Sequence, residues 1–346
     1  MHSPRSLLVT GGAGFIGANF VRYFLDAHPE ARIANLDSLT YAGSLDNLRG
    51  ALDDPRHTFI HGDIANGPLV LSLMRSHHVD TVVHFAAESH VDRSIDGPAT
   101  FVHTNVLGTF VLLEAAREVW GGLTLASAGS GDGSVRFHQV STDEVYGSLN
   151  DDDPPFTERT PYAPNSPYSA SKAAADHLVR AYAHTYGLPI TITNCSNNYG
   201  PLQHPEKFIP TVIAACLAER PIPVYGTGRN IRDWLHVRDH CTAIDTVLRR
   251  GAPGGTYLVG ADNERRNIEL TRIICRLLDE LRPRAAGSYE ELISFVTDRA
   301  GHDFRYAIDA GKLTAELGWK PDIEFETGLR ETIEWYVRRA TANAAE

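Results

Sequence analysis

Cysteine is scarce in this chain of 346 residues, which has four, at positions 195, 216, 241 and 275. No two of them have the C-x-x-C spacing of zinc or redox sites, and four are too few for a disulfide-rich scaffold. We interpret them as buried free thiols of a protein in a reducing cytosol. The sixteen histidines include no H-E-x-x-H motif, so no metal site is predicted.

Positive charge and long apolar runs are also in short supply. The net charge is −11, whereas a nucleic-acid or anionic-membrane partner would need a basic face that neutralises phosphates. No apolar run approaches bilayer length, and the first expected strand begins too close to the N-terminus for a signal peptide. We therefore expect a cytoplasmic protein with neither partner. Its length and 42% hydrophobic content suffice for two domains, or for one large domain with an appended lobe.

A glycine-rich segment, T-G-G-A-G-F-I-G at 10–17, lies between a short apolar run at 7–9 and a segment with helical periodicity at 15–25. Glycines at 11, 14 and 17 would allow a tight turn and a close approach of backbone N–H groups to a pyrophosphate. The alternative is a tight strand-to-helix turn without a ligand. The expected next strand, 32–36, ends in Asp37, whose carboxylate would accept from a ribose diol and repel a 2′-phosphate. NAD is therefore favoured over NADP.

Strands and helices continue to alternate along the chain. Strands are expected at 58–60, 81–85, 135–140, 190–194 and 257–259, and helices at 69–76, 98–119 and 237–248. This alternation predicts an α/β fold with a doubly wound, Rossmann-type parallel sheet, whose ligands gather at the carboxyl ends of the strands. There Asp63 is either an adenine contact or a helix N-cap. The apolar stripe of helix 98–119 is either core or a dimer face. Segment 121–134 is expected to be a surface insertion.

Two neighbouring carboxylates, Asp143 and Glu144, follow the expected strand 135–140. Like charges held close in a partly desolvated site push their pKa values apart, so that one group can donate a proton while the other accepts one. The alternative is a capped turn exposed to water.

Tyr168 and Lys172 are four residues apart near the start of an expected helix, so they share one face. A nearby ammonium would lower the phenol pKa from about 10, which would make Tyr168 a base for a sugar hydroxyl. Tyr and Lys at this spacing are common in helices. The pair is a better candidate for catalysis here because it follows the part of the chain that is expected to bind the nucleotide.

The stretches 201–210 and 221–233 are expected to be rich in loops and carry Lys207, Arg229 and Arg232. These cations could meet a diphosphate, for which Arg232 offers a bidentate fork. The alternative for Arg232 is a surface ion pair with Asp233 or Asp239.

Taken together, these motifs resemble the extended short-chain dehydrogenase/reductase family over nearly the whole chain, through T-G-G-A-G-F-I-G at 10–17 and Y-S-A-S-K at 168–172. Within it they are similar to the dehydratases of nucleotide-activated glucose, through L-D-S-L-T-Y-A-G at 36–43, A-A-E-S-H-V-D-R-S-I at 86–95, S-T-D-E-V-Y-G at 141–147, N-C-S-N-N-Y-G-P at 194–201 and I-R-D-W-L at 231–235. The Thr-Asp-Glu triplet is the most specific of these. The insertion at 121–134 departs from shorter members and leaves loop contacts in doubt.

The resemblance implies a Rossmann NAD-binding domain at 1–198 plus about 236–260. A smaller C-terminal sugar-nucleotide-binding lobe is implied at about 199–235 and 261–346. It also implies a homodimer and catalytic roles for Thr142, Asp143, Glu144, Tyr168 and Lys172. The implied cofactor contacts are Gly11, Gly14, Phe15, Ile16, Gly17, Asp37, Ser38, Leu39, Thr40, Asp63, Ile64, Phe85, Ala86, Ala87, Ser89, Thr104, Tyr168, Lys172 and Asn198. The implied substrate contacts are Ser89, Thr142, Asn197, Glu206, Lys207, Phe208, Pro223, Val224, Tyr225, Arg232, Asn267, Arg299 and His302.

The activity that the resemblance implies is a redox-neutral dehydration of a nucleotide sugar, with dTDP-glucose as the expected substrate. Oxidation at C4 would be followed by loss of water across C5 and C6 and by return of hydride to C6. Two other hypotheses are a UDP-sugar 4-epimerase or UDP-glucuronate decarboxylase, against which the acidic pair speaks, and a non-catalytic NAD-sensing protein, against which the intact Tyr/Lys pair speaks.

Overall fold

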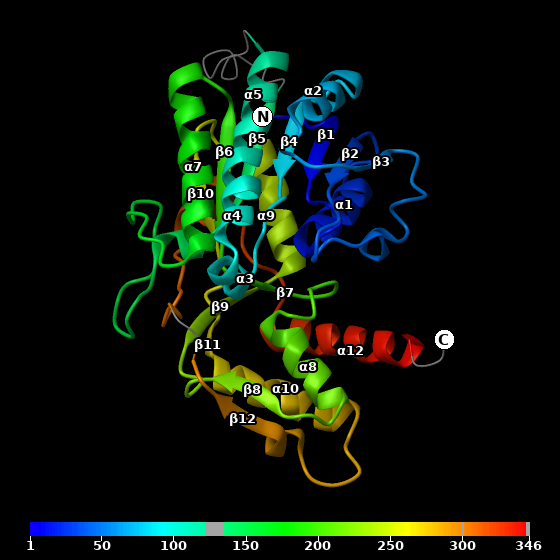
Figure 1. Cartoon of the computed structure of the whole chain (residues 1–346), viewed down its shortest axis with the longest axis vertical. Coiled ribbons are helices and arrows are strands. Elements are labelled where there is room, and N and C mark those ends of the chain that lie inside the picture. The colour runs from blue at the N-terminus through cyan, green and yellow to red at the C-terminus, as the bar shows by residue number, and fades with distance from the viewer. Residues whose placement is uncertain (122–134, 299–300, 344–346) are drawn as a thin grey trace.

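A parallel seven-stranded sheet forms the centre of the computed structural model, which describes residues 1–121, 135–298 and 301–343 (Figure 1). Its strand order is β10-β6-β5-β4-β1-β2-β3. The strands are β1 (Ser6–Thr10), β2 (Arg32–Asp37), β3 (His57–His61), β4 (Thr81–His84), β5 (Arg136–Thr142), β6 (Ile190–Cys195) and β10 (Thr256–Val259). The predicted doubly wound parallel sheet is thereby confirmed.

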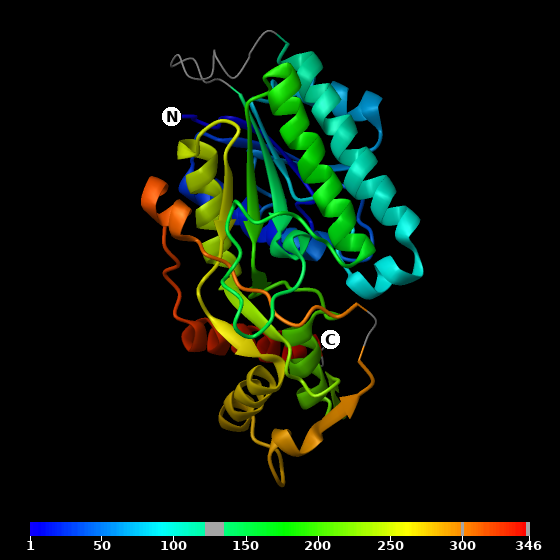
Figure 2. The ribbon, with the colours of Figure 1, turned by 90° about the vertical axis from the view of Figure 1, so that its left-hand side faces the viewer.

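Helices cover both faces of this sheet (Figure 2). α1 (Phe15–Ala27) and α9 (Val237–Arg250) pack on one face, where Phe20 and Ile244 are fully buried. α2 (Gly67–Ser76), α5 (Thr109–Val119) and α7 (Pro167–Tyr186) cover the other, over a core that includes Leu112 and Val179. The apolar faces of these helices therefore enclose two cores and shield the strands between the two edges of the sheet from water, whereas the edge strand β3 is partly exposed.

The expected single helix at 98–119 is more complex. α3 (Val91–Asp96) precedes α4 (Pro98–Phe101), a π-helical turn spans Val102–Gly108, and α5 follows without a break. The predicted apolar stripe divides between two environments: Phe101 and Leu113 are buried, whereas Val102 and Phe110 are exposed.

The helix at Pro98–Val119 also corrects one sequence expectation, because it is long and apolar enough to cross a membrane. It is the one such helix among the described residues, and 44% of its apolar window is buried inside the protein. A core helix of a globular protein passes the same test of length and composition, and here α2 and α7 pack against it.

A second unit lies beyond the carboxyl ends of the central strands (Figure 1). Its strands are β7 (Asn197–Tyr199), β9 (Ile231–His236) and β11 (Glu264–Arg266) in one sheet, and β8 (Ile222–Tyr225) and β12 (Ile293–Val296) in another. Its helices are α8 (Phe208–Leu217), α10 (Asn267–Leu281) and α12 (Phe325–Asn343), whereas α11 (Gly311–Leu317) packs on β10 and α9 at the edge of the central sheet. Short 3₁₀ turns occur at Leu45–Leu48, Asp143–Tyr146 and Tyr289–Leu292.

The expectation that 221–233 is mainly loop was wrong, because it contains β8 and the start of β9. In β8, Ile222 and Val224 are buried while Pro223 and Tyr225 are exposed, which is the alternation of a half-buried strand. Its pairing partner, β12, is far along the chain, and the flanking prolines and glycines conceal the pattern. The four cysteines are free and buried, as predicted. Segment 122–134 lies outside the described residues.

Candidate active site

The glycine-rich turn joins β1 to α1 at the floor of a pocket. Gly11 has φ +73°, and a Cβ there would lie 2.6 Å from the backbone N of Ala86. A Cβ at Gly17 would lie 2.3 Å from the carbonyl O of Gly11. Gly14 is the N-cap of α1 and gives the helix no side-chain cap. Only glycine fits at positions 11 and 17, and the N–H groups at the start of α1 are left for a ligand.

Asp37 ends β2 beside this turn. Its carboxylate accepts hydrogen bonds from the backbone N–H groups of Ala13 (2.9 Å) and Leu39 (2.8 Å). Burial raises the pKa of Asp37, while these two hydrogen bonds lower it. The carboxylate is thus fixed at the rim of the pocket, where a ribose diol could donate to its remaining lone pairs.

Asp63 follows β3 and also lines the pocket. The side chain of Asn66, and not Asp63, caps α2 by accepting from the N–H of Leu69. Asp63 instead accepts from the N–H of Ala65 at 2.8 Å. Of the two sequence interpretations, the structure removes the helix cap, and the adenine contact stays a prediction.

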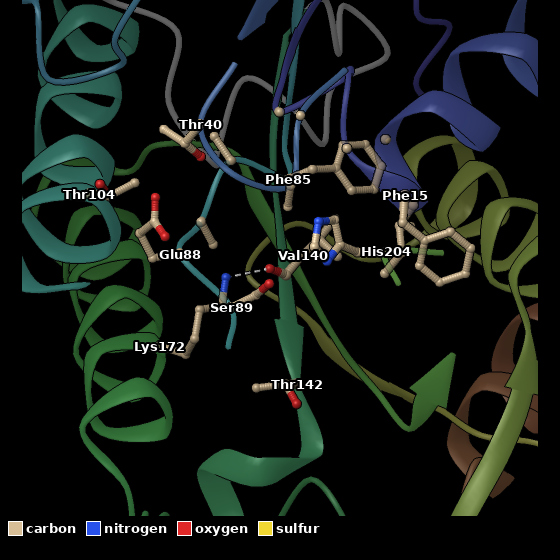
Figure 3. A pocket seen from close by; sticks show the side chains of 18 of the residues that line it. Phe15, Thr40, Phe85, Glu88, Ser89, Thr104, Val140, Thr142, Lys172 and His204 are labelled. Atoms are coloured by element: carbon tan, nitrogen blue, oxygen red, sulfur yellow. Dashed lines mark hydrogen bonds between the residues drawn. The ribbon is translucent and has the colours of Figure 1, made fainter. Parts of the chain in front are cut away.

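The loop after β4 is clamped by the π-helical turn. Asn105 accepts from the N–H of Glu88 (2.9 Å) and donates to its carbonyl O (3.0 Å) and to Ser171 Oγ (2.8 Å). Asn105 is 1% exposed. Such wide turns recur at functional sites, and this one holds the 86–89 loop against α7, with Glu88 and Thr104 beside the pocket (Figure 3).

The acidic pair lies where β5 becomes a 3₁₀ turn capped by Thr142. Asp143 is 1% exposed, accepts from Thr142 Oγ1 at 3.3 Å, and its Oδ2 has no hydrogen-bond partner among the described residues. Burial raises the pKa of Asp143 well above its ordinary value, and the charges of Glu144 and Asp233 raise it further. This environment favours the protonated form of Asp143, and its burial excludes the exposed capped turn.

Tyr168 and Lys172 lie on one face of α7, which begins with a Ser166/Ser169 capping box and ends at Gly187. Lys172 Nζ donates to the carbonyl O of Val140 at 2.8 Å (Figure 3). Burial, and next the charge of Glu144, raise the pKa of Tyr168 well above 10. The expected lowering by Lys172 was therefore wrong for this structure, because burial of the phenol outweighs the ammonium, which is turned toward Val140.

These features fit a bound dinucleotide. The uncapped N-terminus of α1, the turn that admits no Cβ, and the fixed carboxylate of Asp37 lie along one side of the pocket. The acidic pair, Tyr168 and Lys172 line the same pocket. A nucleotide extended along the carboxyl ends of the strands would place its far half beside these groups.

Most predicted cofactor contacts line this pocket, and Leu39 is the exception. Leu39 has φ +50° and packs against the core beneath α1. Four of the predicted substrate contacts also line it, namely Ser89, Thr142, Asn197 and Lys207. The structure does not bring to this pocket Glu206, Phe208, Pro223, Val224, Tyr225, Arg232, Asn267 and His302. Arg299 lies outside the described residues.

Several of these remaining residues have definite partners. The Arg232 guanidinium is buried, lies over the Tyr306 ring at 4.2 Å, and donates to the carbonyl O atoms of Ile231, Asp303 and Phe304. His302 bonds Asp298 at 2.6 Å. Phe208 and Asn267 begin α8 and α10, and Pro223, Val224 and Tyr225 belong to β8.

The sequence analysis missed several pocket residues. Tyr41, Glu88 and His204 line the pocket, and the first two stand inside the quoted motifs at 36–43 and 86–95. Their positions after β2 and β4 were the available signal, since ligand contacts concentrate at such strand ends. His204 had no comparable signal, because it is brought there by the second unit.

Comparisons with known proteins agree with this geometry. Residues 8–332 match the family model described as GDP-mannose 4,6 dehydratase. A dTDP-glucose 4,6-dehydratase of Xanthomonas campestris pv. campestris (strain B100) is 57% identical over 336 residues, which are 96% of this chain and 93% of that protein. The crystal structure of DesIV, a dTDP-glucose 4,6-dehydratase from Streptomyces venezuelae with NAD and TYD bound, has a TM-score of 0.86 and 46% identity, and covers 97% of this chain and 98% of its own.

The fold is also shared with proteins whose names give other activities. A UDP-glucose 4-epimerase from Thermotoga maritima, solved with UDP-glucose, has a TM-score of 0.84 at 25% identity, over 97% of this chain and 99% of its own. Fold similarity alone therefore does not select the reaction. The family match and the high identity confirm the resemblance deduced from the motifs: the chain belongs to the GDP-mannose 4,6 dehydratase family, among the extended short-chain dehydrogenase/reductases, and is similar to dTDP-glucose 4,6-dehydratases.

Proposed function

We propose that this protein is an NAD-dependent hydro-lyase that converts dTDP-glucose to dTDP-4-keto-6-deoxyglucose. One observation carries the proposal: a buried carboxyl group whose pKa is raised, Asp143, stands directly beside a second carboxylate, Glu144, in the pocket that also contains Tyr168 and Lys172. Elimination of water needs one acid and one base on neighbouring carbons, and this pair supplies both. The 57% identity to a dTDP-glucose 4,6-dehydratase supports the substrate.

The first chemical stage falls to the α7 pair. We assign Tyr168 Oη to accept the proton of the C4 hydroxyl. Burial raises the pKa of Tyr168, so this step requires the positive charges of Lys172 and of bound NAD to bring the phenol into its phenolate form. Thr142 Oγ1 donates a hydrogen bond to the C4 oxygen as charge develops there. Lys172 keeps a positive charge near this oxygen. The chemistry that NAD supplies when bound is reversible hydride acceptance, and its oxidised ring also brings positive charge.

The second stage falls to the acidic pair. A ketone at C4 acidifies the C5–H bond, and Glu144 removes that proton. Asp143 gives its proton to the C6 hydroxyl, which leaves as water. A buried carboxylic acid is suited to this donation because water cannot remove its proton in advance. Return of hydride to C6 and of a proton to C5 completes the 4-keto-6-deoxy sugar.

The direct test is to incubate the purified protein separately with dTDP-glucose, UDP-glucose, UDP-glucuronate and GDP-mannose and to analyse the products by mass spectrometry and NMR. We expect a product lighter by one water from dTDP-glucose. An unchanged mass with an inverted C4 centre would indicate an epimerase, and loss of CO₂ from UDP-glucuronate a decarboxylase. Binding of NAD without turnover of any sugar would indicate a sensing protein.

We further propose that the chain divides into an NAD-binding domain, 1–198 plus about 236–260, and a sugar-nucleotide-binding lobe, about 199–235 and 261–346. The partition of strands supports this division, because the central sheet draws only on the first set of residues and the two small sheets on the second, apart from the two ends of β7 and β9 that cross the bounds at 198 and 236.

We also propose a cytoplasmic homodimer. Exposed apolar side chains gather along α3 to α5 and at the end of α7, which contacts α5; they are Ile95, Val102, Leu107, Phe110 and Tyr186. Contiguous exposed apolar residues on paired helices are typical of an interface between copies. The free, buried thiols support a reducing compartment.

A further inference from the structure

Asp176 is a buried carboxylate for which neither the motifs nor the mechanism above provides a role. It lies on α7 four residues after Lys172, which itself lies four residues after Tyr168. Side chains at such spacings line one face of a helix. Asp176 is 0% exposed, and a buried charge is retained only where partners stabilise it.

One oxygen of Asp176 ties α7 to two central strands. Oδ2 accepts from Ser141 Oγ (2.7 Å), Tyr162 Oη (2.9 Å) and Asn194 Nδ2 (3.2 Å). Ser141 belongs to β5 and directly precedes Thr142 and the acidic pair. Asn194 belongs to β6 and also donates to the carbonyl O of Thr142 at 3.2 Å. The carboxylate thus connects the helix with the phenol and amine to the strand end with the acids.

The negative charge of Asp176 acts on the amine of Lys172. Burial lowers the pKa of Lys172, and Asp176 is the largest opposing influence, followed by Cys195 of β6. Burial raises the pKa of the Cys195 thiol, so that group is neutral. His84 of β4, which also senses Lys172, is neutral because burial lowers its pKa to about 3.

The other titratable groups near Lys172 have their main effects on residues other than Lys172. Tyr168 is a neutral phenol whose pKa is raised by burial, and the charges of Asp143 and Glu144 are felt by Tyr168 and Cys195. Among the described residues, the ammonium donates its hydrogen bond to an uncharged carbonyl, Val140 O. Asp176 is therefore the nearby anion that offsets the desolvation of the Lys172 ammonium.

We propose that Asp176 is a positioning residue, whose carboxylate keeps Lys172 in its ammonium form and holds the acidic end of β5 against α7. Its effect on turnover rests on the proposed dehydration, whereas its effect on Lys172 does not. A carboxylate two helical turns beyond the phenol thus sets the charge state of the residue between them.

The composition of the chain makes a direct measurement possible, because it contains four lysines, at 172, 207, 312 and 320. Protein labelled with ¹³Cε-lysine should give four side-chain signals in an NMR titration, assigned through Lys207→Arg, Lys312→Arg and Lys320→Arg. In Asp176→Asn we expect the Lys172 midpoint to fall by about one pH unit or more, which is at least about tenfold in the ionisation constant. An unchanged midpoint would overturn the proposal.

Two further variants separate charge from hydrogen bonding. Tyr162→Phe removes one hydrogen bond to Asp176 Oδ2 and leaves its charge, so the Lys172 midpoint should stay at the wild-type value. Asp176→Glu keeps the charge on a longer side chain, so its midpoint should lie near the wild-type value even if Asp176→Asn does not fold. A fall in either variant as large as that expected on neutralisation would contradict an electrostatic role.

The kinetic arm uses dTDP-glucose and NAD. If the Lys172 ammonium is required, the alkaline limb of the kcat profile should move to lower pH in Asp176→Asn, by as much as the NMR midpoint. A loss of kcat that is equal at every pH would show a merely structural role. If the wild-type protein does not convert dTDP-glucose, the proposed function fails, and the NMR titration still decides the role of Asp176.

Discussion

Asp143 is almost fully buried beside another carboxylate, and its pKa is raised because ionisation would place two negative charges in a poorly solvated site. The same burial has a thermodynamic consequence. A carboxyl group whose pKa is raised on folding binds its proton more tightly in the folded state. Stability therefore falls as pH rises from the unfolded-state pKa, about 3.9, toward the folded-state pKa.

Asp143→Asn should remove the loss of stability that the wild type shows as pH rises. We expect the variant to gain stability over the wild type as pH rises above about 4, by about 1.4 kcal/mol for each pKa unit by which folding raises Asp143. Thermal unfolding followed across a pH series would measure the difference, and Asp152→Asn reports the effect of losing an exposed carboxylate. A variant that is less stable than the wild type at pH 7 would contradict a strongly raised pKa. The same variant should eliminate water slowly, since an amide donates no proton.

Glu144→Gln should separate the two chemical stages. Oxidation at C4 needs Tyr168 and not Glu144, so the variant should reach the ketone and stop. Addition of dTDP-glucose should then produce a stable absorbance of reduced cofactor in the protein, with product formation slowed at least about a hundredfold, which is the usual contribution of a general base.

Tyr168→Phe is the matched control for that experiment, because it lacks the first base and should show no accumulation of reduced cofactor. Rapid release of product by Glu144→Gln would remove Glu144 from the role of base.

For individual residues, the sequence identified the reactive side chains more reliably than the direction of their pKa shifts. The acidic pair and the Tyr/Lys pair were found from local spacing, and the structure brings all four into one pocket. The direction of the Tyr168 pKa shift was wrong, because burial depends on what packs around the side chain. Asp176 was overlooked although it continues the Tyr168 and Lys172 spacing, since its partners Ser141 and Asn194 lie on distant strands.

Among the elements, the turn before α1 has the tightest backbone packing in the site. Gly17→Ala would bring a Cβ to 2.3 Å from Gly11 O and 2.8 Å from Gly12 Cα. We expect a loss of about 1–3 kcal/mol in stability, as in other overpacked sites, together with weakened NAD binding in a calorimetric titration.

Gly67→Ala offers a matched comparison at the start of α2. A Cβ there would meet only Val111 Cγ1, at 3.7 Å, so stability should stay constant or rise by up to about 1 kcal/mol. Undiminished NAD affinity in Gly17→Ala would show that the turn does not hold the cofactor.

The helix α3 is tied to the second unit by Arg93. Its guanidinium lies over the Tyr41 ring at 4.2 Å and bonds Glu206 from Nε (3.2 Å) and Nη2 (2.5 Å). Arg93→Ala should raise the KM for dTDP-glucose by up to about fivefold, the range of an exposed ion pair, and leave kcat nearly unchanged.

The effect of Arg93→Ala should shrink at high salt, because this pair is exposed. Arg75→Ala breaks a comparable exposed pair with Glu118 and should leave steady-state kinetics unchanged. A fall in kcat alone, without a change in KM, would contradict a role for Arg93 in holding the loop that carries Glu206 and the pocket residue Lys207.

For the whole molecule, we predict that the apolar surface along α3 to α5 forms the interface of the proposed dimer. We expect twice the chain mass in light scattering coupled to size exclusion. Phe110→Glu should shift the protein toward the monomer, because a charge at a buried contact is unpaired. Phe295→Glu changes another exposed phenylalanine, in the second unit, and should leave the mass unchanged. A wild-type monomer would contradict the proposed dimer.

The two units differed in how far sequence could predict them. In the central sheet β1, β3, β4 and β5 are each followed by a helix before the next strand, so local periodicity was enough to identify the parallel fold. The second unit is assembled from pairs remote in sequence, such as β8 with β12 and β7 with β9. No local pattern indicates such partners, and proline within β8 argued against a strand. The substrate contacts expected there consequently remain less defined than the cofactor contacts.

The helix α7 also constrains how this gene can change in length. An α-helix advances about 100° per residue, so one inserted or deleted codon between Tyr168 and Asp176 would swing the later side chains a quarter turn or more around the axis. Single substitutions between these residues can be tolerated, whereas the number of residues between Tyr168 and Asp176 cannot change. We expect libraries of in-frame insertions to leave this interval empty among surviving clones, even where neighbouring segments accept extra residues.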